Sequence, residues 1–549
     1  NVAVSAYVPL PFFGTKLIFT PGTSFGKGIS NVMSEIRDFN GDGFPDLIKT
    51  NSDTLMIRKS TIARSNKLKS VVNSLGGKFY LDYEHTGASS DFPGGKWVMS
   101  SLVIDDGISD DGPMMMNSFE YANGRRDRYE REFLGFGQVT TNNINTDDNN
   151  EMYRKTIQEF DVSSYLLQGN LLSTTIKDAE DNIYTRTSNE YHKYRLWAYD
   201  DGYYDFRNLD VIGNDVVSIY SPISYSVTKQ FEGNSSGVII AESEYDYFVP
   251  TEGHGELMEY KYSDKGSLRS NGNYDYNTFI AYKEHDSNTN IFGLPTSVTV
   301  KDNSGAILRQ TSATYANGHP NEVTSVTRRL NGSETATTDF TYDDFGNLTK
   351  TQYPDDENGS SLTYEYSYED TMGMYIETVT NKNESFESSI DGYDLRYGIP
   401  LSKTDINDQT ITYTVDDLGR ILTILSPMNA STSSGFGGNG TEYTIKFEYF
   451  PAVLDSVTYE IISPAYAITR HYDERRSLAD DSDIETIAFC DGFGRIIQTK
   501  KEAMVYSGNA SSAHSMIVSG KNIYDSYGRV VKTYYPTSEA FSNTAKIQY

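Results

Sequence analysis

The 549-residue chain contains a single cysteine, Cys490, and only two tryptophans. One thiol excludes an intrachain disulfide and any zinc site built from several cysteines. The seven histidines are scattered and show no H-E-x-x-H spacing, so the sequence lacks the helical ligand pair of zinc peptidases. The fold therefore has to be held by its own core and backbone hydrogen bonds, which a chain of this length can provide.

Basic residues and long apolar runs are also scarce. Lys and Arg total 47 against 76 Asp and Glu, a net charge of −29. Such a chain repels phosphate, which argues against nucleic acid as a partner. The moderately apolar opening, residues 2–19, is interrupted by Pro9, Pro11, Gly14 and Lys16. We therefore expect neither a signal sequence nor a transmembrane segment there, and no other stretch is long enough to span a membrane.

Tyrosine and glycine, in contrast, are abundant, with 43 and 44 residues. Tyr, Thr, Ile and Val favour β-strands, and glycine with Asn and Asp favours tight turns between them. The 13% aromatic content argues against disorder. We predict an all-β fold, with one short helix within residues 59–75 as the only helical element. Because the chain begins with Asn1, we expect it to be an internal fragment of a larger protein.

One sequence unit recurs: an aromatic strand, an Asp, an apolar residue, a Gly and then Arg or Asn before an apolar strand. Four strong copies occupy residues 340–348, 413–421, 489–496 and 523–530. Weaker copies lie at Tyr262–Leu268, Asp302–Ile307 and Asp178–Ile183. Chance alone produces some D-x-x-G sequences in any hairpin-rich protein, but four copies that share all of these positions indicate a repeat.

Each position of this unit has a structural reason. Asp accepts hydrogen bonds from nearby backbone amides and so starts a turn. Gly adopts the positive φ that closes a short hairpin loop. We expect positive φ at Gly346, Gly419, Gly494 and Gly528. We expect the middle residues Phe345, Leu418, Phe493 and Tyr527 to fold over the hairpin ends. We expect Tyr342, Tyr413, Phe489 and Tyr524 to pack sideways against neighbouring hairpins.

This pattern, Y-D-x-x-G-R followed by an apolar strand, resembles the YD repeat of RHS proteins and teneurins. In those families the repeats are β-hairpins that wind into a spiral, hollow shell. The resemblance implies that residues 166–549 form part of such a β-shell. A long open sheet edge invites aggregation, so a sheet of this length is expected to close or spiral.

A dense acidic loop near the start of the chain has the spacing of a cation site. Its oxygen ligands fall at loop positions 1, 3, 5 and 9, and the carbonyl at position 7 can complete the set, which suits structural Ca²⁺. The residues are Asp38, Asn40, Asp42, Asp46 and, through its carbonyl, Phe44. An EF-hand requires Glu at position 12, where this chain has Lys49. The loop resembles the cation loop of FG-GAP or VCBS propeller blades. The alternative is an Asx-rich turn without metal.

A second motif runs from Phe119 to Val139 and includes the stretch E-R-E-F-L-G-F-G. It resembles the middle region of bacterial toxin-complex B components and of SpvB-like proteins, and its alternating charges indicate a structural hairpin without chemistry. We therefore divide the chain into an FG-GAP/VCBS-like blade (1–65), a toxin-complex B middle-region-like β domain (66–165) and a YD/RHS repeat shell (166–549).

Catalytic motifs are weak. Residues 233–237, G-N-S-S-G, match a nucleophile elbow formally, but an apolar strand pattern follows where the elbow requires a helix. Cys490 lies inside a repeat hairpin beside Asp491, and His254 lies between two glycines in a loop. We predict that the protein is not an enzyme.

The resemblance implies a shell segment of a secreted or surface-located bacterial toxin-complex protein that encloses and delivers a C-terminal toxin. Its expected partners are its own cargo domain and other toxin-complex or secretion components. The alternative hypothesis is a cell-surface adhesion scaffold of teneurin type, in which the same repeats display a binding surface.

Overall fold

The computed structural model describes most of the chain. The described residues are 6–9, 16–19, 34–39, 44–51, 54–61, 66–108, 115–147, 149–198, 204–208, 218–247, 255–264, 266–284, 291–316, 319, 321–429, 442–473, 483–508, 511–542, 544 and 547–549. Two compact units are present: Asn1–Lys67 with His85–Trp97, and Leu68–Glu84 with Val98–Tyr549. Among the described residues, no helix is long and apolar enough to cross a membrane.

The first unit contains two small antiparallel sheets. One pairs β1 (Ala6–Pro9) with β2 (Lys16–Phe19). The other has the order β3 (Ser34–Arg37), β4 (Asp46–Asn51) and β5 (Thr54–Arg58).

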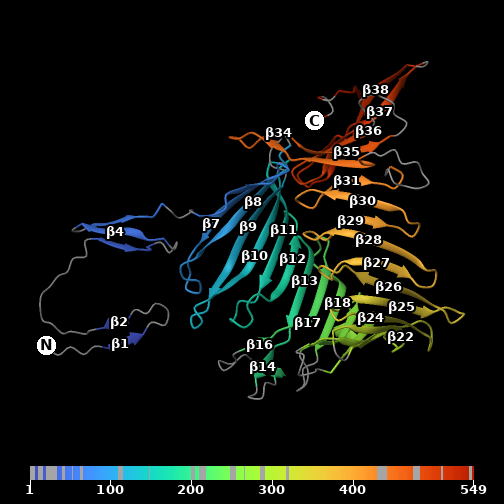
Figure 1. Cartoon of the computed structure of the whole chain (residues 1–549). Coiled ribbons are helices and arrows are strands. Elements are labelled where there is room, and N and C mark those ends of the chain that lie inside the picture. Colours follow the sequence, from blue (N-terminus) through green and yellow to red (C-terminus); the bar gives the residue numbers. More distant parts are fainter. Residues whose placement is uncertain are drawn as a thin grey trace, which may run out of the picture. The chain divides into compact units, whose positions relative to one another are not determined.

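The second unit is dominated by one large sheet whose strands are hydrogen-bonded in sequence order and close on themselves (Figure 1). Its earlier strands are β6 (Ser70–Val72), β7 (Lys78–Thr86), β8 (Lys96–Asp105), β9 (Met115–Arg126), β10 (Phe133–Asn145), β11 (Glu151–Phe160), β12 (Leu171–Lys177), β13 (Ile183–Tyr191), β17 (Ile223–Gln230), β18 (Val238–Tyr247), β19 (Leu257–Ser263), β20 (Tyr276–Tyr282), β21 (Pro295–Lys301) and β22 (Ile307–Tyr315). Its later strands are β23 (Val323–Arg329), β24 (Thr335–Tyr342), β25 (Leu348–Asp355), β26 (Ser361–Tyr368), β27 (Ile376–Asn381), β28 (Phe386–Asp394), β29 (Ile399–Thr404), β30 (Thr410–Val415), β31 (Ile421–Leu425), β32 (Ile445–Phe450), β35 (Ala465–Tyr472), β36 (Asp483–Cys490), β37 (Ile496–Ser507), β38 (Ser511–Ser519) and β41 (Thr537–Ala540).

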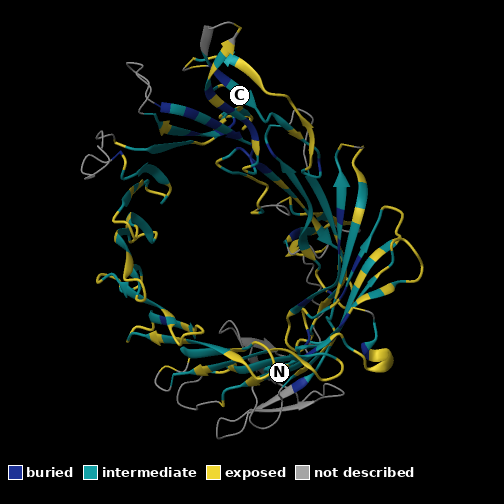
Figure 2. Cartoon of the chain, turned by 90° about the vertical axis from the view of Figure 1, so that its right-hand side faces the viewer, coloured by how far each residue is buried: buried dark blue, intermediate teal, exposed yellow. Residues whose placement is uncertain are grey.

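Three small sheets accompany the large one. They are β15 (Tyr204–Asn208) with β14 (Tyr194–Ala198) and β16 (Ile219–Tyr220), β33 (Val453–Leu454) with β34 (Ile461–Ser463), and β39 (Asn522–Tyr524) with β40 (Val530–Thr533). The all-β prediction is confirmed. The second unit is one curved sheet, not a two-layer sandwich (Figure 2).

The helix prediction for residues 59–75 is wrong where the structure describes that range, because β6 lies at Ser70–Val72; residues 62–65 lie outside the described residues. Among the described residues a helix lies elsewhere, at α1 (Leu268–Asn271), which ends at Gly272 with φ of 73°. It begins at Leu268, the last residue of the weak repeat predicted at Tyr262–Leu268, and that copy starts in the final residues of β19.

The large sheet is a wall one layer thick over most of its length. Strands such as β21 and β31 are half-buried at nearly every position, without the alternation of buried and exposed residues that a packed second layer produces. Strict alternation appears in β36, where Ile487 and Phe489 are fully buried. That region holds the hydrophobic core cluster, with Ile468, Ile497 and Met516.

The two faces of the wall differ in chemistry. Directly opposed residues on neighbouring strands point to the same face, so the strand registers show which residues belong to which face. One face carries α1, whose Arg269 guanidinium lies 3.5 Å from the ring centre of Tyr225 and forms two hydrogen bonds with Glu190. Figure 2 shows this helix on the convex side of the curved sheet. We call this the outer face, and the opposite, concave one the inner face.

Followed through the strand registers, the outer face is rich in hydroxyl and charged side chains. Its cross-strand hydrogen-bonded pairs include Thr327 with Thr337, Ser367 with Thr378, Thr404 with Thr410 and Thr414 with Thr423. The inner face is richer in aromatic and aliphatic residues. Its opposed pairs include Tyr245 with Tyr260, Ile280 with Val298, Tyr366 with Val379, Tyr413 with Ile424, and Ile424 with Ile445.

The repeat turns have the predicted geometry. Positive φ is found at Gly346 (84°), Gly419 (79°), Gly494 (76°) and Gly528 (77°). In the first copy, one Asp343 oxygen accepts hydrogen bonds from the N–H groups of Phe345 and Asn347, both at 2.9 Å. Asp416, Asp491 and Asp525 accept the equivalent two bonds. The hydrogen bond from the Asn347 side chain is the largest cause that holds the pKa of Asp343 below its ordinary value. The cap is therefore complete at neutral pH and is lost only when the pH falls through that lowered value.

The same cap recurs beyond the strong copies. Asp178 and Asp302 cap their turns as predicted. Two further copies, at Asp356 and Asp405, were not identified from the sequence. In the second of these, Asp408 takes the place of glycine with φ of 57°, a conformation that Asp tolerates better than most residues.

Tyrosines at the ends of strands link each strand to an earlier one, which is the other strand of the same hairpin in every case except Tyr524. Each hydroxyl donates to the carbonyl of the residue that begins an earlier strand, at 2.5–3.2 Å. The pairs are Tyr191 with Leu171, Tyr247 with Ile223, Tyr282 with Leu257, Tyr315 with Pro295, Tyr342 with Val323, Tyr368 with Leu348, Tyr393 with Ile376, Tyr449 with Ile421 and Tyr524 with Ile496. At each of these tyrosines except Tyr449, the register with the next strand shifts by a bulge. A bulge changes the direction of the side chain and bends the strand, so these tyrosine hydrogen bonds lie at points where the sheet curves.

A β-branched residue at a turn glycine should destabilise the protein through backbone strain. We expect Gly346→Val to lower the free energy of unfolding by about 1–3 kcal/mol, as measured by urea titration. The control is Gly392→Val, because Gly392 has no positive φ and its added Cβ would contact nothing within 4 Å. Equal losses at both positions would contradict the assigned strain.

Candidate closure site

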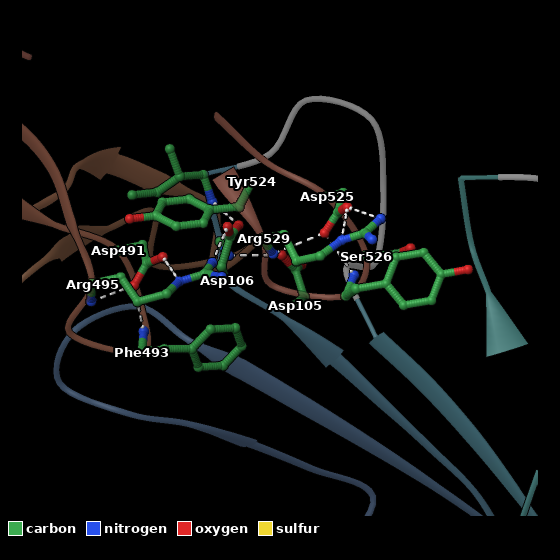
Figure 3. A network of polar contacts seen from close by, with 12 residues as sticks. Asp105, Asp106, Asp491, Phe493, Arg495, Tyr524, Asp525, Ser526 and Arg529 are labelled. Carbon is green, nitrogen blue, oxygen red and sulfur yellow. Dashed lines mark hydrogen bonds and ion pairs between the residues drawn. The ribbon is translucent and has the colours of Figure 1, made fainter. Parts of the chain in front are cut away.

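Where the large sheet closes on itself, side chains that are far apart in the sequence also meet. We call this region the closure site (Figure 3). It joins the turns at Asn73–Gly77, Asp105–Ile108 and Asn145–Asp147 to the repeat turns Asp491–Arg495 and Asp525–Arg529.

The first contact is centred on Asp106. This aspartate is 4% exposed, and its carboxylate accepts a hydrogen bond from Arg495 Nη2 at 3.1 Å. The same guanidinium donates through Nε to Asp491, at 2.6 Å, and lies 3.9 Å from the ring centre of Tyr524. Asp491 is fully buried. Arg495 is therefore shared between its own turn and a strand end almost 400 residues earlier, and the two buried carboxylates surround one cation.

Backbone groups complete this first contact. Gly492 N–H donates to the Asp106 carbonyl at 2.9 Å, and the Gly492 carbonyl accepts from Asn73 Nδ2 at 2.8 Å. The backbones approach so closely that a Cβ on Gly492 would lie 2.2 Å from Gly77 Cα. Only glycine fits at this position.

The second contact uses the next repeat turn. Ser526 N–H donates to Asp147 Oδ2 and Ser526 Oγ to Asn145 Oδ1, both at 2.8 Å. The Tyr527 ring meets Tyr153 edge-on at 4.6 Å, as Phe493 meets Phe79 at 6.3 Å in the first contact. Each docked turn thus combines a backbone hydrogen bond with an aromatic pair.

The middle apolar residues of the four strong copies follow two behaviours. Phe493 and Tyr527 pack against Phe79 and Tyr153, aromatic residues of other strands, which the sequence did not predict. Phe345 and Leu418 are 87% and 69% exposed, so the prediction that they fold over their hairpin ends is wrong. In those two copies, none of the strand ends that the structure describes lies over the turn.

Sequence reasoning did not identify the closure site, although one signal was present. The second residue of the turn is Asp344, Asp417, Gly492 or Ser526 in the four strong copies. The two copies without an acidic residue there are the two that dock, and they dock onto Asp106 and Asp147. An aspartate at that position would place like charges together.

The predicted cation loop lies in the first unit, and the structure describes only part of it. Asp38, Phe44 and Asp46 are described, whereas Asn40 and Asp42 lie outside the described residues. Asp46 is fully buried, and its carboxylate accepts hydrogen bonds from Phe39 N–H at 3.0 Å and Ser60 N–H at 2.8 Å. Each carboxylate oxygen has a second lone pair, so these bonds leave coordination possible. No group of three or more His, Cys, Asp or Glu suited to a metal occurs within the described parts of the chain.

The catalytic candidates occupy structural positions. Gly233–Gly237 lies in the turn between β17 and β18, so a strand follows where a nucleophile elbow needs a helix. Cys490 ends β36, and burial, followed by the charge of Asp491, raises the pKa of its thiol, which keeps it protonated. His254 lies outside the described residues.

Comparison with known proteins gives one family match. Residues 19–161 match the family described as insecticide toxin TcdB middle/N-terminal region. No curated protein matches the chain. The resemblance to toxin-complex B components, predicted from the motif at residues 119–139, is therefore confirmed.

Three solved structures share the fold. A TcdB2-TccC3-Cdc42 crystal structure is 15% identical, with a TM-score of 0.64 over 92% of this chain and 38% of that one. A TcdB2-TccC3 crystal structure is 15% identical, with a TM-score of 0.66 over 95% and 34%. The Photorhabdus luminescens Tc holotoxin pore, carrying a TccC3 mutation, is 14% identical, with a TM-score of 0.67 over 95% and 35%. The chain spans little more than a third of the length of these proteins.

The close backbone approach at Gly492 can be tested directly. We expect Gly492→Ala to lower the free energy of unfolding by about 1–3 kcal/mol, because the closure site has no room for a methyl group. Hydrogen exchange of residues 73–77 should rise in parallel. Asp417→Ala, at the same position of an undocked turn, should stay within about 0.5 kcal/mol of the parent protein. The closure site is misassigned if the two variants behave alike.

Proposed function

We propose that this chain is a shell segment of a toxin-complex protein of the TcdB type, which encloses a polypeptide cargo and delivers it. The single observation that supports this most is the wall itself. It is one layer thick, it closes in strand order, and its concave face is rich in half-buried aromatic and aliphatic side chains. The similar solved structures are toxin-complex assemblies, which supports partners of the same kind and a secreted location.

The chemistry of the two faces favours enclosure over display. Hydroxyl and charged groups on the outer face suit contact with water, whereas tyrosine offers apolar area together with a polar handle. An unfolded cargo chain exposes apolar side chains, which such an inner face can contact weakly at many points. The adhesion scaffold remains the second candidate, but it would place the recognition chemistry on the outer face.

Neighbouring residues of one strand point to opposite faces, and this provides a test. We expect a photo-crosslinking amino acid at Tyr366, on the inner face, to capture a destabilised reporter domain fused after Tyr549. The same group at Glu365, on the outer face, should capture little. Mass spectrometry of the crosslinked peptides measures both. Equal capture from the two faces, or capture only from Glu365, would remove the support for enclosure and favour the adhesion scaffold.

We further propose that the chain acts without catalysis. No nucleophile, base and orienting group converge among the described residues, and the similar structures are complex components. Reproducible hydrolase or transferase turnover that a single substitution abolishes would overturn this proposal.

We also propose that the loop of Asp38, Asn40, Asp42, Phe44 and Asp46 binds Ca²⁺ in a structural role. Calorimetry should detect binding heat with Ca²⁺ that the Asp42→Ala variant lacks, because that variant removes a carboxylate ligand. Mg²⁺ should bind more weakly, since it requires stricter octahedral geometry. Equal Ca²⁺ heats in both proteins would identify the loop as a metal-free Asx turn.

A further inference from the structure

Four hairpin turns, two of which belong to strong repeat copies, form a continuous edge of the wall, which we call the rim. They are residues 343–347, 369–375, 394–398 and 416–420. Lateral contacts join them. Asn347 Nδ2 donates to the Gly373 carbonyl at 2.7 Å. Tyr397 donates its hydroxyl hydrogen to the Asp417 carbonyl at 2.5 Å. The second and third turns also touch, because a Cβ on Gly398 would lie 2.7 Å from the Tyr375 ring. The rim is therefore one continuous surface and not four independent loops.

Large apolar side chains project from the rim. Phe345 is 87% and Leu418 69% exposed, and Met372, Met374 and Tyr397 are exposed between them. Isolated exposed apolar residues are common on proteins and need no explanation. Here they recur on adjacent, mutually bonded turns, which is the arrangement expected of a binding surface.

The closure site provides an internal comparison for this surface. There, Phe493 and Tyr527 occupy the same turn position as Phe345 and Leu418, and both are covered by aromatic side chains of another edge. The turn is therefore a docking element when a matching surface is present. On the rim, the same element has no covering strand end within the described part of the chain.

Charge decides which surface can cover the rim. Where the docked turns have Gly492 and Ser526, the rim has Asp344 and Asp417. The Asp417 carboxylate is fully exposed and lies 3.7 Å from the guanidinium of Arg396, in a surface ion pair that water screens and a partner cation can replace. These carboxylates lie beside the apolar tips and exclude acidic edges such as those that carry Asp106 and Asp147. A second copy of this chain, with a net charge of −29, would be repelled in the same way.

We propose that the rim is a docking surface for a basic protein partner, whose cations pair with Asp344 and Asp417 while its apolar pockets receive Phe345 and Leu418. This goes beyond the enclosing role proposed above, which concerns the inner face. The apolar tips supply most of the affinity, and the carboxylates supply specificity and the rate of encounter.

A designed amphipathic helix of leucine and lysine serves as the probe, with binding followed by fluorescence titration. We expect the double variant Phe345→Ser/Leu418→Ser to weaken binding about tenfold. Asp344→Asn/Asp417→Asn should weaken it by a similar factor at low salt, and this difference should shrink at high salt. A counterpart helix with serine in place of leucine should bind the parent protein no better than it binds the Phe345→Ser/Leu418→Ser variant.

Matched variants on the opposite edge of the wall control for the overall acidity of the chain. Leu330→Ser/Ile406→Ser removes two apolar residues that are also exposed, at 58% and 54%, and Glu357→Gln/Asp408→Asn removes the same charge. Both should bind the probe as the parent protein does. Loss of binding in these controls to the same extent, or no loss in the rim variants, overturns the proposal. So does salt-promoted self-association of the parent that the rim variants abolish, because that result would make a second copy the partner.

Discussion

The wall depends on one recurrent interaction, the acceptance of two backbone N–H groups by a single aspartate oxygen at the start of each repeat turn. These two hydrogen bonds satisfy backbone N–H groups of the turn within five residues, and a glycine with positive φ closes the turn. A hairpin stabilised in this way needs no second layer above its loop. Repetition of the turn therefore produces a sheet that is extended, half-buried on both faces and poor in fully buried core.

The tyrosine bonds convert a series of hairpins into a curved wall. Each hydroxyl ties the end of one strand to the beginning of an earlier one, and the bulge at the tyrosine bends the next pairing. Burial is the largest cause that raises the pKa of residues such as Tyr342 and Tyr368, so these hydroxyls stay protonated and remain donors. Because the wall is curved, its hydroxyl-rich face is convex and its aromatic face is concave. This asymmetry underlies the proposed enclosure.

The repeat turn appears in two states within one molecule. At the closure site, Gly492 and Ser526 let the backbone of another edge approach, and the adjacent aromatic residues are covered. On the rim, Asp344 and Asp417 keep such an edge away, and the adjacent apolar residues remain exposed. The residue at one position of the repeat thus distinguishes a turn that docks inside the molecule from a turn that stays on the surface. A small residue there leaves room for another backbone, whereas an aspartate there repels an acidic edge.

The sequence by itself determined the local structure. Asp343 and Gly346 predicted their turn because both act on backbone groups within five residues, and the strand pattern predicted the fold class for the same reason. The tertiary structure decided which turns meet. Asp106 and Arg495 are 389 residues apart, and nothing in local spacing pairs them, because the accumulated bend of the whole sheet brings them together. The exposure of Phe345 and the partial burial of Phe493 follow from that meeting, since among the four strong copies the turns that another part of the wall covers lie where the curved wall returns to its own edge.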